Sequence, residues 1–224
     1  MTGPRKAGVR GPYAKSAQRS SDILDAATTV FATHGYHGGS LRDIARQLDV
    51  GLTSIVHHFG SKDELLVAVL ERSDRTTSGN EEFDFDAVCT ARGVVPATLE
   101  RVRSSVERPE LLRLFAILAA ESSAPSHPAH EWFVDRYQRK AKELAEAFSY
   151  DQATGRIVPE RNAQLLAQLL LATWDGVQLQ WLINPAVDME QAMRLFFESA
   201  LPEAMPAVDV TPVMTTTRDG NHID

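Results

Sequence analysis

A single cysteine, Cys89, occurs in the 224 residues, so no disulfide can form within the chain, and a reducing compartment suits it. Long apolar runs are lacking as well. The longest charge-free stretches of the apolar C-terminal region, residues 162–174 and 176–187, are separated by Asp175 and are each too short to span a bilayer. Because no apolar run follows the basic N-terminus, a signal peptide is not expected. These absences favour a cytoplasmic protein with no membrane partner.

Catalytic sequence motifs are lacking too. The chain has no Ser/His/Asp order, Gly-rich phosphate loop or HExxH run, so we expect neither enzymatic activity nor a cofactor. Two histidine pairs, His34 with His37 and His127 with His130, have a spacing that permits metal binding on a helix. No cysteine or carboxylate set at metal-ligand spacing accompanies them, and neutral imidazoles are commonly just hydrogen-bonded, so we expect no metal.

Strand-like alternation is scarce, whereas helical periodicity runs through most of the chain and is clearest over residues 19–66. A first helix there has Ser20 or Ser21 as its N-cap and Gly35 as its C-terminal stop. Its apolar face consists of Ile23, Ala26, Ala27, Val30 and Phe31. The pattern predicts an all-α protein that begins with a small helical unit.

A second short helix follows, with Ser40 as N-cap and Asp43 in its first turn, and a tight turn at residues 49–51 leads to a third over residues 52–58. So short a connection requires a sharp angle, which is the geometry of a helix-turn-helix whose last helix enters the DNA major groove. A capping box then begins a fourth helix at Ser61. The predicted DNA-binding residues are Ser40, Arg42, Gly51, Leu52, Thr53, Ser54, His57, His58 and Lys62.

Charge is distributed unevenly along the chain. The net charge is −7, but residues 1–62 carry +4 and residues 63–224 carry −11. A basic end on an acidic protein is typical of one anion-binding surface. The first 18 residues contain cations, glycine and proline and no acid, so we expect a flexible basic arm that is either an ordinary solvated tail or a further contact to DNA.

At these residues the chain resembles the TetR family of bacterial transcriptional regulators. The matching positions are residues 23–27, Phe31, residues 35–36, Gly38, residues 40–41 and 44–45, Leu48, Val50 and residues 57–66. The resemblance implies a dimer that binds a palindromic operator in double-stranded DNA. Three residues depart from the family pattern: Asp49 replaces glycine, Gly51 replaces serine, and Val56 replaces a tyrosine that often reaches a phosphate. Asp49 is acceptable in the turn because Asp can adopt the left-handed backbone conformation.

Beyond residue 72 the pattern stays helical after a polar break at residues 72–82. Residues 83–93 are ambiguous. Helices are predicted over about residues 96–107, 109–122, 129–149 and 159–183, with a last one capped by Asp188. The last two have more apolar residues than one stripe can hold, so we expect them to pair with a second copy across a two-fold axis, as the corresponding helices of the TetR family do. The predicted dimerisation residues are Leu166, Leu170, Val177, Trp181, Met193, Phe196 and Phe197.

A small-molecule pocket is expected among the central C-terminal helices. Its candidate lining residues are Phe115, Leu118, Trp132, Tyr137, Trp174 and Gln178, although core packing is the simpler interpretation of each one alone. The scarcity of charge in these helices favours an apolar or aromatic ligand.

Four regions are therefore expected: a flexible arm (1–18), a helix-turn-helix DNA-binding domain (19–66), a helical ligand-binding and dimerisation domain (67–201) and a disordered tail (202–224). The hypothesis is a dimeric transcriptional regulator, a repressor that a ligand releases from DNA. The alternatives are a DNA-binding regulator without a ligand response, a helical enzyme that uses the C-terminal bundle, and an adaptor that uses the N-terminal unit to bind other proteins.

Overall fold

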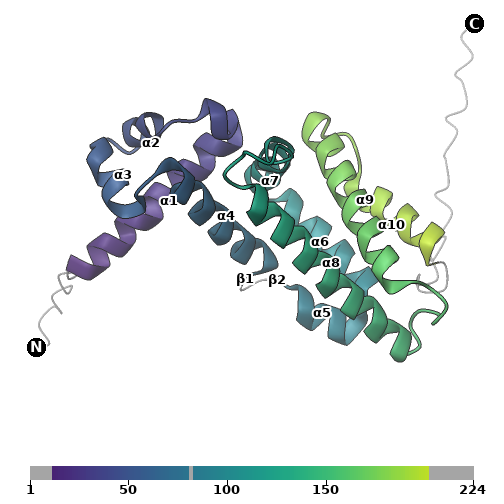
Figure 1. Ribbon diagram of the computed structural model, residues 1–224. Helices are drawn as coiled ribbons and strands as arrows, with labels where there is room; N and C mark the ends of the chain where they lie inside the picture. Colours follow the sequence, from purple (N-terminus) through teal and green to yellow (C-terminus); the bar gives the residue numbers. More distant parts are fainter. Residues whose placement is uncertain (1–11, 81–82, 202–224) are drawn as a thin grey trace, which may run out of the picture.

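The computed structural model describes residues 12–80 and 83–201, which form an all-α fold of a small N-terminal head and a larger C-terminal body (Figure 1). The expected tail and the first eleven residues of the expected arm lie outside the described residues. The head contains α1 (Pro12–Gly38), α2 (Leu41–Gln47), α3 (Leu52–Phe59) and α4 (Lys62–Ser78). The body contains α5 (Phe85–Arg92), α6 (Val94–Val106), α7 (Pro109–Glu121), α8 (His130–Ala153), α9 (Ala163–Ile183) and α10 (Met189–Ala200). Between head and body, β1 (Gly79–Asn80) pairs with β2 (Phe83–Asp84).

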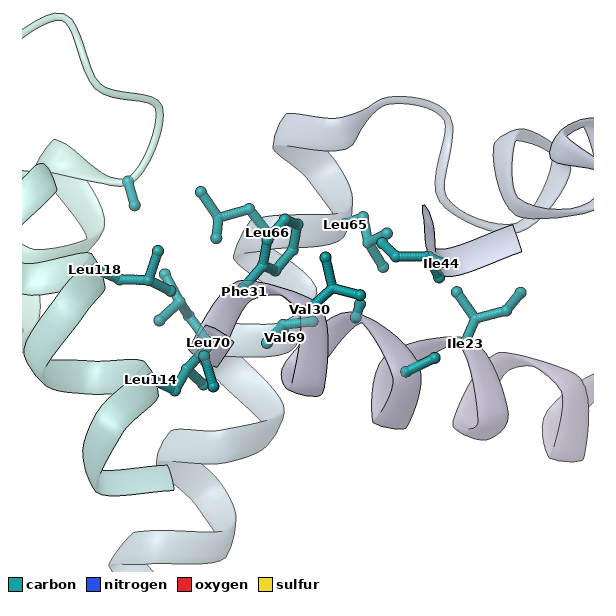
Figure 2. Close-up of a cluster of buried hydrophobic side chains, with 14 of the residues drawn as sticks. Ile23, Val30, Phe31, Ile44, Leu65, Leu66, Val69, Leu70, Leu114 and Leu118 are labelled. Carbon is teal, nitrogen blue, oxygen red and sulfur yellow. The ribbon is translucent and has the colours of Figure 1, made fainter. Parts of the chain in front are cut away.

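One apolar cluster fills the head and continues into the body. It contains Ile23 and Phe31 of α1, Ile44 of α2 and Ile55 of α3, all fully buried. Figure 2 shows that Leu114 and Leu118 of α7 join the same cluster beside Leu66 and Leu70 of α4. The head therefore completes its core with a helix of the body.

The junction between head and body also has a polar contact at a kink in α1. Gly35 has a φ of 69°, and a Cβ there would collide with the carboxylate of Glu121 at the end of α7. That carboxylate accepts a hydrogen bond of 2.7 Å from the backbone N–H of Tyr36. The predicted helix stop at Gly35 is thus a kink, after which the helix continues to Gly38, because a side chain of the body binds a backbone donor that the kink leaves free.

The N-cap predicted at Ser20 or Ser21 is wrong, because α1 begins earlier, at Pro12, and both serines lie inside the helix. Three other local signals of the head are confirmed. The Ser40 hydroxyl accepts a hydrogen bond of 3.2 Å from the Asp43 N–H and caps α2. Asp49 occupies the left-handed region with a φ of 52°, which Asp tolerates better than most residues. Ser61 and Glu64 form a reciprocal capping box at the start of α4, with both hydrogen bonds at 3.1 Å.

Two boundaries differ from those expected. First, α1 begins at Pro12, so residues 12–18 of the expected flexible arm are helical; proline is favoured in the first turn of a helix because it lacks an N–H. Second, α4 continues through the expected polar break to Ser78. Asp74 explains this, because its side chain is only 12% exposed and binds Arg136 and Arg139 of α8 at 2.9 and 2.6 Å. These ion pairs bury a polar stretch against the body.

A second apolar cluster forms the core of the body. Val94 and Val102 of α6, Phe148 of α8, Leu166 of α9 and Phe197 of α10 are among its buried members. Buried polar contacts accompany it: the Asp151 carboxylate accepts a hydrogen bond of 2.8 Å from the Val94 N–H and pairs with Arg156. Glu190 on α10 binds Arg103 on α6. The two arginines that bind Glu190, Arg103 and Arg194, hold its pKa near 2.

The ambiguous segment 83–93 consists of β2 and the short helix α5, which Asp84 caps through a hydrogen bond of 3.0 Å from the Ala87 N–H. In the described ranges, no helix combines the length and apolar character that a bilayer crossing demands.

Replacing Leu118 by alanine tests the shared core. Leu118 is fully buried where α7 meets the head. We expect L118A to lower the free energy of unfolding by about 2 to 5 kcal/mol, since a buried Leu→Ala change loses transfer free energy and leaves a cavity. The measurement is urea unfolding followed by circular dichroism.

Val158 provides the control because it is a surface aliphatic residue, 39% exposed. V158A should stay within about 0.5 kcal/mol of the unsubstituted protein. Equal effects of L118A and V158A would contradict the shared core.

Candidate nucleic-acid interface and ligand cavity

Helix α3 is held by one face and presents the other to solvent. Ile55 is fully buried, whereas Leu52 and Val56 are 38% and 43% exposed, and Thr53 and His57 are exposed beside them. Gly51 caps the helix without a side chain: its carbonyl accepts a hydrogen bond of 2.9 Å from the Ser54 N–H, but the first N–H groups of α3 have no side-chain acceptor at the cap. An exposed, partly apolar helix with free N–H groups at its start is suited to contact both base edges and phosphates.

His58 is the first correction to the predicted DNA-binding residues. It is half-buried, and its Nδ1 lies 3.1 Å from the hydroxyl of Ser20 on α1. The side chain therefore faces α1 and fixes the end of α3, because His58 comes one residue after the exposed His57 and so lies on another side of the helix.

Lys62 is the second correction. Its Nζ lies 4.1 Å above the ring of Tyr36, and the Tyr36 hydroxyl donates to Asp63. Burial lowers the pKa of Lys62, while the negative charges of Asp63 and Glu121 oppose that change. Lys62 is thus half-buried at the junction between head and body, where it contributes a cation–π contact.

Helix α2 and the start of α1 supply exposed cations. Arg42 is exposed on α2, and Arg46, 79% exposed, pairs with Asp43 at 2.6 Å. The Ser40 hydroxyl is occupied as the cap of α2, and its hydrogen bond lowers the pKa of Asp43. Lys15 and Arg19 are exposed on α1, within five residues of the Ser20 that contacts α3.

Three of these cations, Lys15, Arg19 and Arg46, were absent from the predicted site. Pro12 at the start of α1 was the signal that could have found the first two, since it is the residue that begins the helix.

The body contains a cavity of about 440 Å³ between α6, α7, α8 and α9. Four of the six predicted lining residues lie on its wall: Phe115, Tyr137, Trp174 and Gln178. Three of them make hydrogen bonds: Tyr137 donates to Asp175 at 2.7 Å, while Trp174 donates to the side-chain carbonyl of Gln178 at 2.9 Å and Gln178 donates to the Leu112 carbonyl at 3.2 Å. Burial and the hydrogen bond to Asp175 raise the pKa of Tyr137.

Leu118 and Trp132 are not on that wall. Leu118 lies on the face of α7 that packs against the head (Figure 2), whereas Phe115, three residues earlier, reaches the cavity. Trp132 stacks on Phe115 with ring centroids 6.3 Å apart and packs against the head cluster. Both were chosen as apolar residues of central helices, and the direction in which each faces depends on its neighbours.

The wall is also more charged than the sequence suggested. Arg101 and Arg108 on or beside α6 and Arg136 on α8 line the cavity. An amphipathic helix normally turns its arginines to solvent, so the helical pattern did not predict that these face inward.

The predicted dimerisation residues divide into two groups. Leu166, Leu170, Met193 and Phe197 are between 0 and 6% exposed in the core of the body, so they are not available to a partner. Val177, Trp181 and Phe196 are half-buried. The strongly exposed apolar residues on these helices are Leu165, Leu169, Leu179 and Ile183 of α9 and Leu195 of α10, at 45 to 77%.

Of the histidines considered for metal binding, His127 and His37 have packing contacts. His127 is buried, lies edge-on to Tyr36 with ring centroids 4.9 Å apart, and its Nδ1 accepts a hydrogen bond of 3.1 Å from the Ala129 N–H. His37 lies beside the same rings. In the described part of the chain, no group of three or more histidine, cysteine or acidic side chains could hold a metal ion.

Comparisons with known proteins agree with this geometry. Residues 23–69 match the family model described as bacterial regulatory proteins, tetR family. The HTH-type transcriptional repressor DhaR of Mycobacterium sp. (strain GP1) is 27% identical over 186 residues, which cover 80% of this chain and 91% of that protein. The A-factor receptor protein of Streptomyces griseus is 23% identical over 166 residues, and the match spans only about half of its length, 56%.

Solved structures share the fold. A protein from Rhodococcus sp. described as a TetR-family transcriptional regulator has a TM-score of 0.65 at 24% identity, over 82% of this chain and 96% of that one. A protein from Saccharomonospora viridis described as a transcriptional regulator, in complex with choline, has a TM-score of 0.66 at 22% identity, over 83% and 98%. With the match at the helix-turn-helix and the agreement of the whole fold, the chain is similar to the TetR family of transcriptional regulators both in its helix-turn-helix and in its overall fold.

Proposed function

We propose that this regulator is a homodimeric repressor that binds a palindromic operator and leaves it when a small molecule occupies the cavity of the body. The observation that carries the proposal is α3, which is anchored by the buried Ile55 and exposes Thr53 and His57. A helix fixed in this way can enter a major groove without losing its packing.

Base reading is assigned to the exposed side of α3. Thr53 and His57 lie four residues apart and so project from one side of the helix, with Leu52 and Val56 beside them. Leu52 and Val56 are suited to contact thymine methyl groups. Gly51 and Ser54, at the start of α3, lie close to its free N–H groups, where a phosphate is favoured.

Phosphate contacts are assigned to the cations around α3. Arg42 and Arg46 come from α2, while Lys15 and Arg19 come from the first turns of α1. Each phosphate neutralised by such a side chain releases counterions, so affinity should fall steeply with salt.

The dimer is assigned to the outer face of α9 and α10. Leu165, Leu169 and Ile183 recur at helical spacing on α9 and are 52%, 45% and 77% exposed. Large apolar side chains exposed in a row mark an interaction surface, and a two-fold axis allows one such face to cover its copy. Two heads would then have to lie roughly 34 to 36 Å apart, or a multiple, to reach successive grooves.

Release is assigned to α7 because this helix contacts both the cavity and the head. Phe115 lines the cavity, Leu118 packs in the core of the head, and Glu121 binds the Tyr36 N–H. A ligand that prefers one position of α7 would shift the heads by its differential affinity for the two arrangements.

Relatives support repression. DhaR and the Pseudomonas putida protein NicS, which is 41% identical over 68 residues, are named repressors, whereas FasR of Mycolicibacterium smegmatis, 38% identical over 71 residues, is named an activator. These last two matches cover the helix-turn-helix region, about a third of each protein.

Repression is tested with a reporter gene placed downstream of an operator that the protein selects from randomised duplex DNA. Expression of the reporter should rise when the regulator is deleted.

The base-reading assignment is tested with the operator selected by the protein from randomised duplex DNA. We expect T53A and H57A each to weaken binding to that operator about tenfold, because a lost base contact costs roughly 1 to 3 kcal/mol, and to change binding to random duplex little. R42Q should instead weaken both and lower the salt slope by about 1. Fluorescence anisotropy across a salt series measures all three.

T90A is the matched control, because Thr90 is exposed on α5 in the body. It should bind like the unsubstituted protein. Equal losses on operator and random DNA for T53A and H57A would refute base reading by α3.

The dimer face is tested by the double substitution L165E/L169E. Two carboxylates on this face should leave the protein monomeric at micromolar concentration and abolish its preference for a palindrome over a half-site. Sedimentation velocity gives the mass, and V158E, on an exposed site outside both helices, is the control. A double variant that still dimerises would place the interface elsewhere.

A further inference from the structure

Basic side chains gather around the cavity of the body, although residues 63–224 carry a net charge of −11. Those on its wall are Arg101, Arg108, Arg136, Arg139 and Lys140. The acids on the wall are Asp86, Glu143 and Asp175. The cavity wall thus has a local excess of positive charge in an otherwise acidic body.

Much of the positive charge is half-buried as well as concentrated. Burial, together with the neighbouring charges of Arg136 and Arg108, lowers the pKa of Arg101 to about 10, while Asp74 opposes this. Arg101 therefore remains protonated at neutral pH, although both its burial and its neighbours disfavour the charge. An anion beside it would gain from a positive potential in a medium of low dielectric constant.

The acids around the cavity are engaged by groups of the protein. Asp175 accepts the hydrogen bond from Tyr137, and burial raises its pKa, which favours the neutral form. Glu143 pairs with Lys140 at 2.9 Å, and Asp74, behind the wall, binds Arg136 and Arg139. The acids are therefore poor partners for a cationic ligand.

Arg136 removes a second means of binding a cation. Its guanidinium lies 4.5 Å from the centroid of the Phe115 ring, so it covers an aromatic face that could otherwise hold an ammonium group. A ligand such as the choline seen with the Saccharomonospora viridis protein would meet a protein cation at this ring.

The remainder of the wall is suited to an apolar body with one polar group. Leu112, Phe115, Leu171 and Trp174 supply apolar surface. Thr98 lines the same cavity and is 3% exposed, and within the described ranges its hydroxyl has no hydrogen-bond partner. A buried hydroxyl without a partner costs free energy that a ligand oxygen would recover.

We propose that the cavity binds an amphipathic organic anion, a carboxylate on an apolar body, with the head group at Arg101 and Thr98 and the body against Phe115 and Trp174. This inference rests on the proposed function, in which the cavity is the ligand site. A volume of about 440 Å³ suits a small organic acid.

The test uses three probes that share a phenylbutyl body and differ in the head group: phenylbutyrate, phenylbutanol and phenylbutylamine. Isothermal titration calorimetry of the full-length protein should give the order carboxylate, alcohol, amine, with phenylbutyrate at least about tenfold tighter than phenylbutanol, as a charge-assisted hydrogen bond provides. Equal binding of the three, tighter binding of the amine, or no binding of any at millimolar concentration would overturn the anion site.

Two substitutions locate the head group. R101Q should bring phenylbutyrate to the affinity of phenylbutanol, and T98V should weaken phenylbutyrate a few-fold while leaving phenylbutanol less affected. R113Q is the control, since Arg113 is exposed on α7 and is not on the wall of the cavity. R101Q protein that still distinguishes the carboxylate from the alcohol by the same factor would refute the role of Arg101.

Operator binding separates this inference from the proposed function. If phenylbutyrate binds selectively but the operator complex survives its saturation, the anion site stands and ligand-induced release fails. If the free protein does not bind the operator, the proposed function fails whatever the calorimetry shows.

Discussion

The packing of α7 against α1 and α4 is the contact on which the rest of the structure depends. Leu114 and Leu118 are fully buried there with Phe31 and Leu66, in a cluster that belongs to head and body at once (Figure 2). The head has no complete core without α7. Because close-packed interiors do not deform continuously, a displacement of α7 must either carry α1 with it or open a void.

Polar contacts around this cluster fix how α7 and α8 lie against the helices of the head. Glu121 binds the Tyr36 N–H at the kink of α1, and Asp74 of α4 binds Arg136 and Arg139 of α8. The side chains of Asp74 and Arg136 are only 12% and 18% exposed, so loss of either partner would leave a poorly solvated charge. Apolar packing provides the contact area, while these directional bonds determine which residues meet. The guanidinium of Arg136 also lies over the Phe115 ring in the cavity wall, so this arginine contacts both the head and the cavity.

Sequence reasoning succeeded where the chemistry is local and failed where a neighbour decides. The Ser40 cap, the left-handed Asp49 and the capping box at Ser61 depend on residues within four positions, and each is confirmed. On α9, apolar residues come in adjacent pairs such as Leu165 with Leu166, and only the packed helices determine that Leu166 faces inward. For the same reason the fold class was predicted fully, four of six cavity residues were found, and the arginines of the cavity wall were missed.

The shared core has a consequence for protein engineering. A hybrid regulator could be designed by exchanging the head of this chain for that of a relative, with the cut placed after α4. In this chain such a cut would separate Phe31 and Leu66 from Leu114 and Leu118 and pair each half with foreign side chains. A functional chimera must therefore transplant α7 together with the head, or redesign the surface at which they meet.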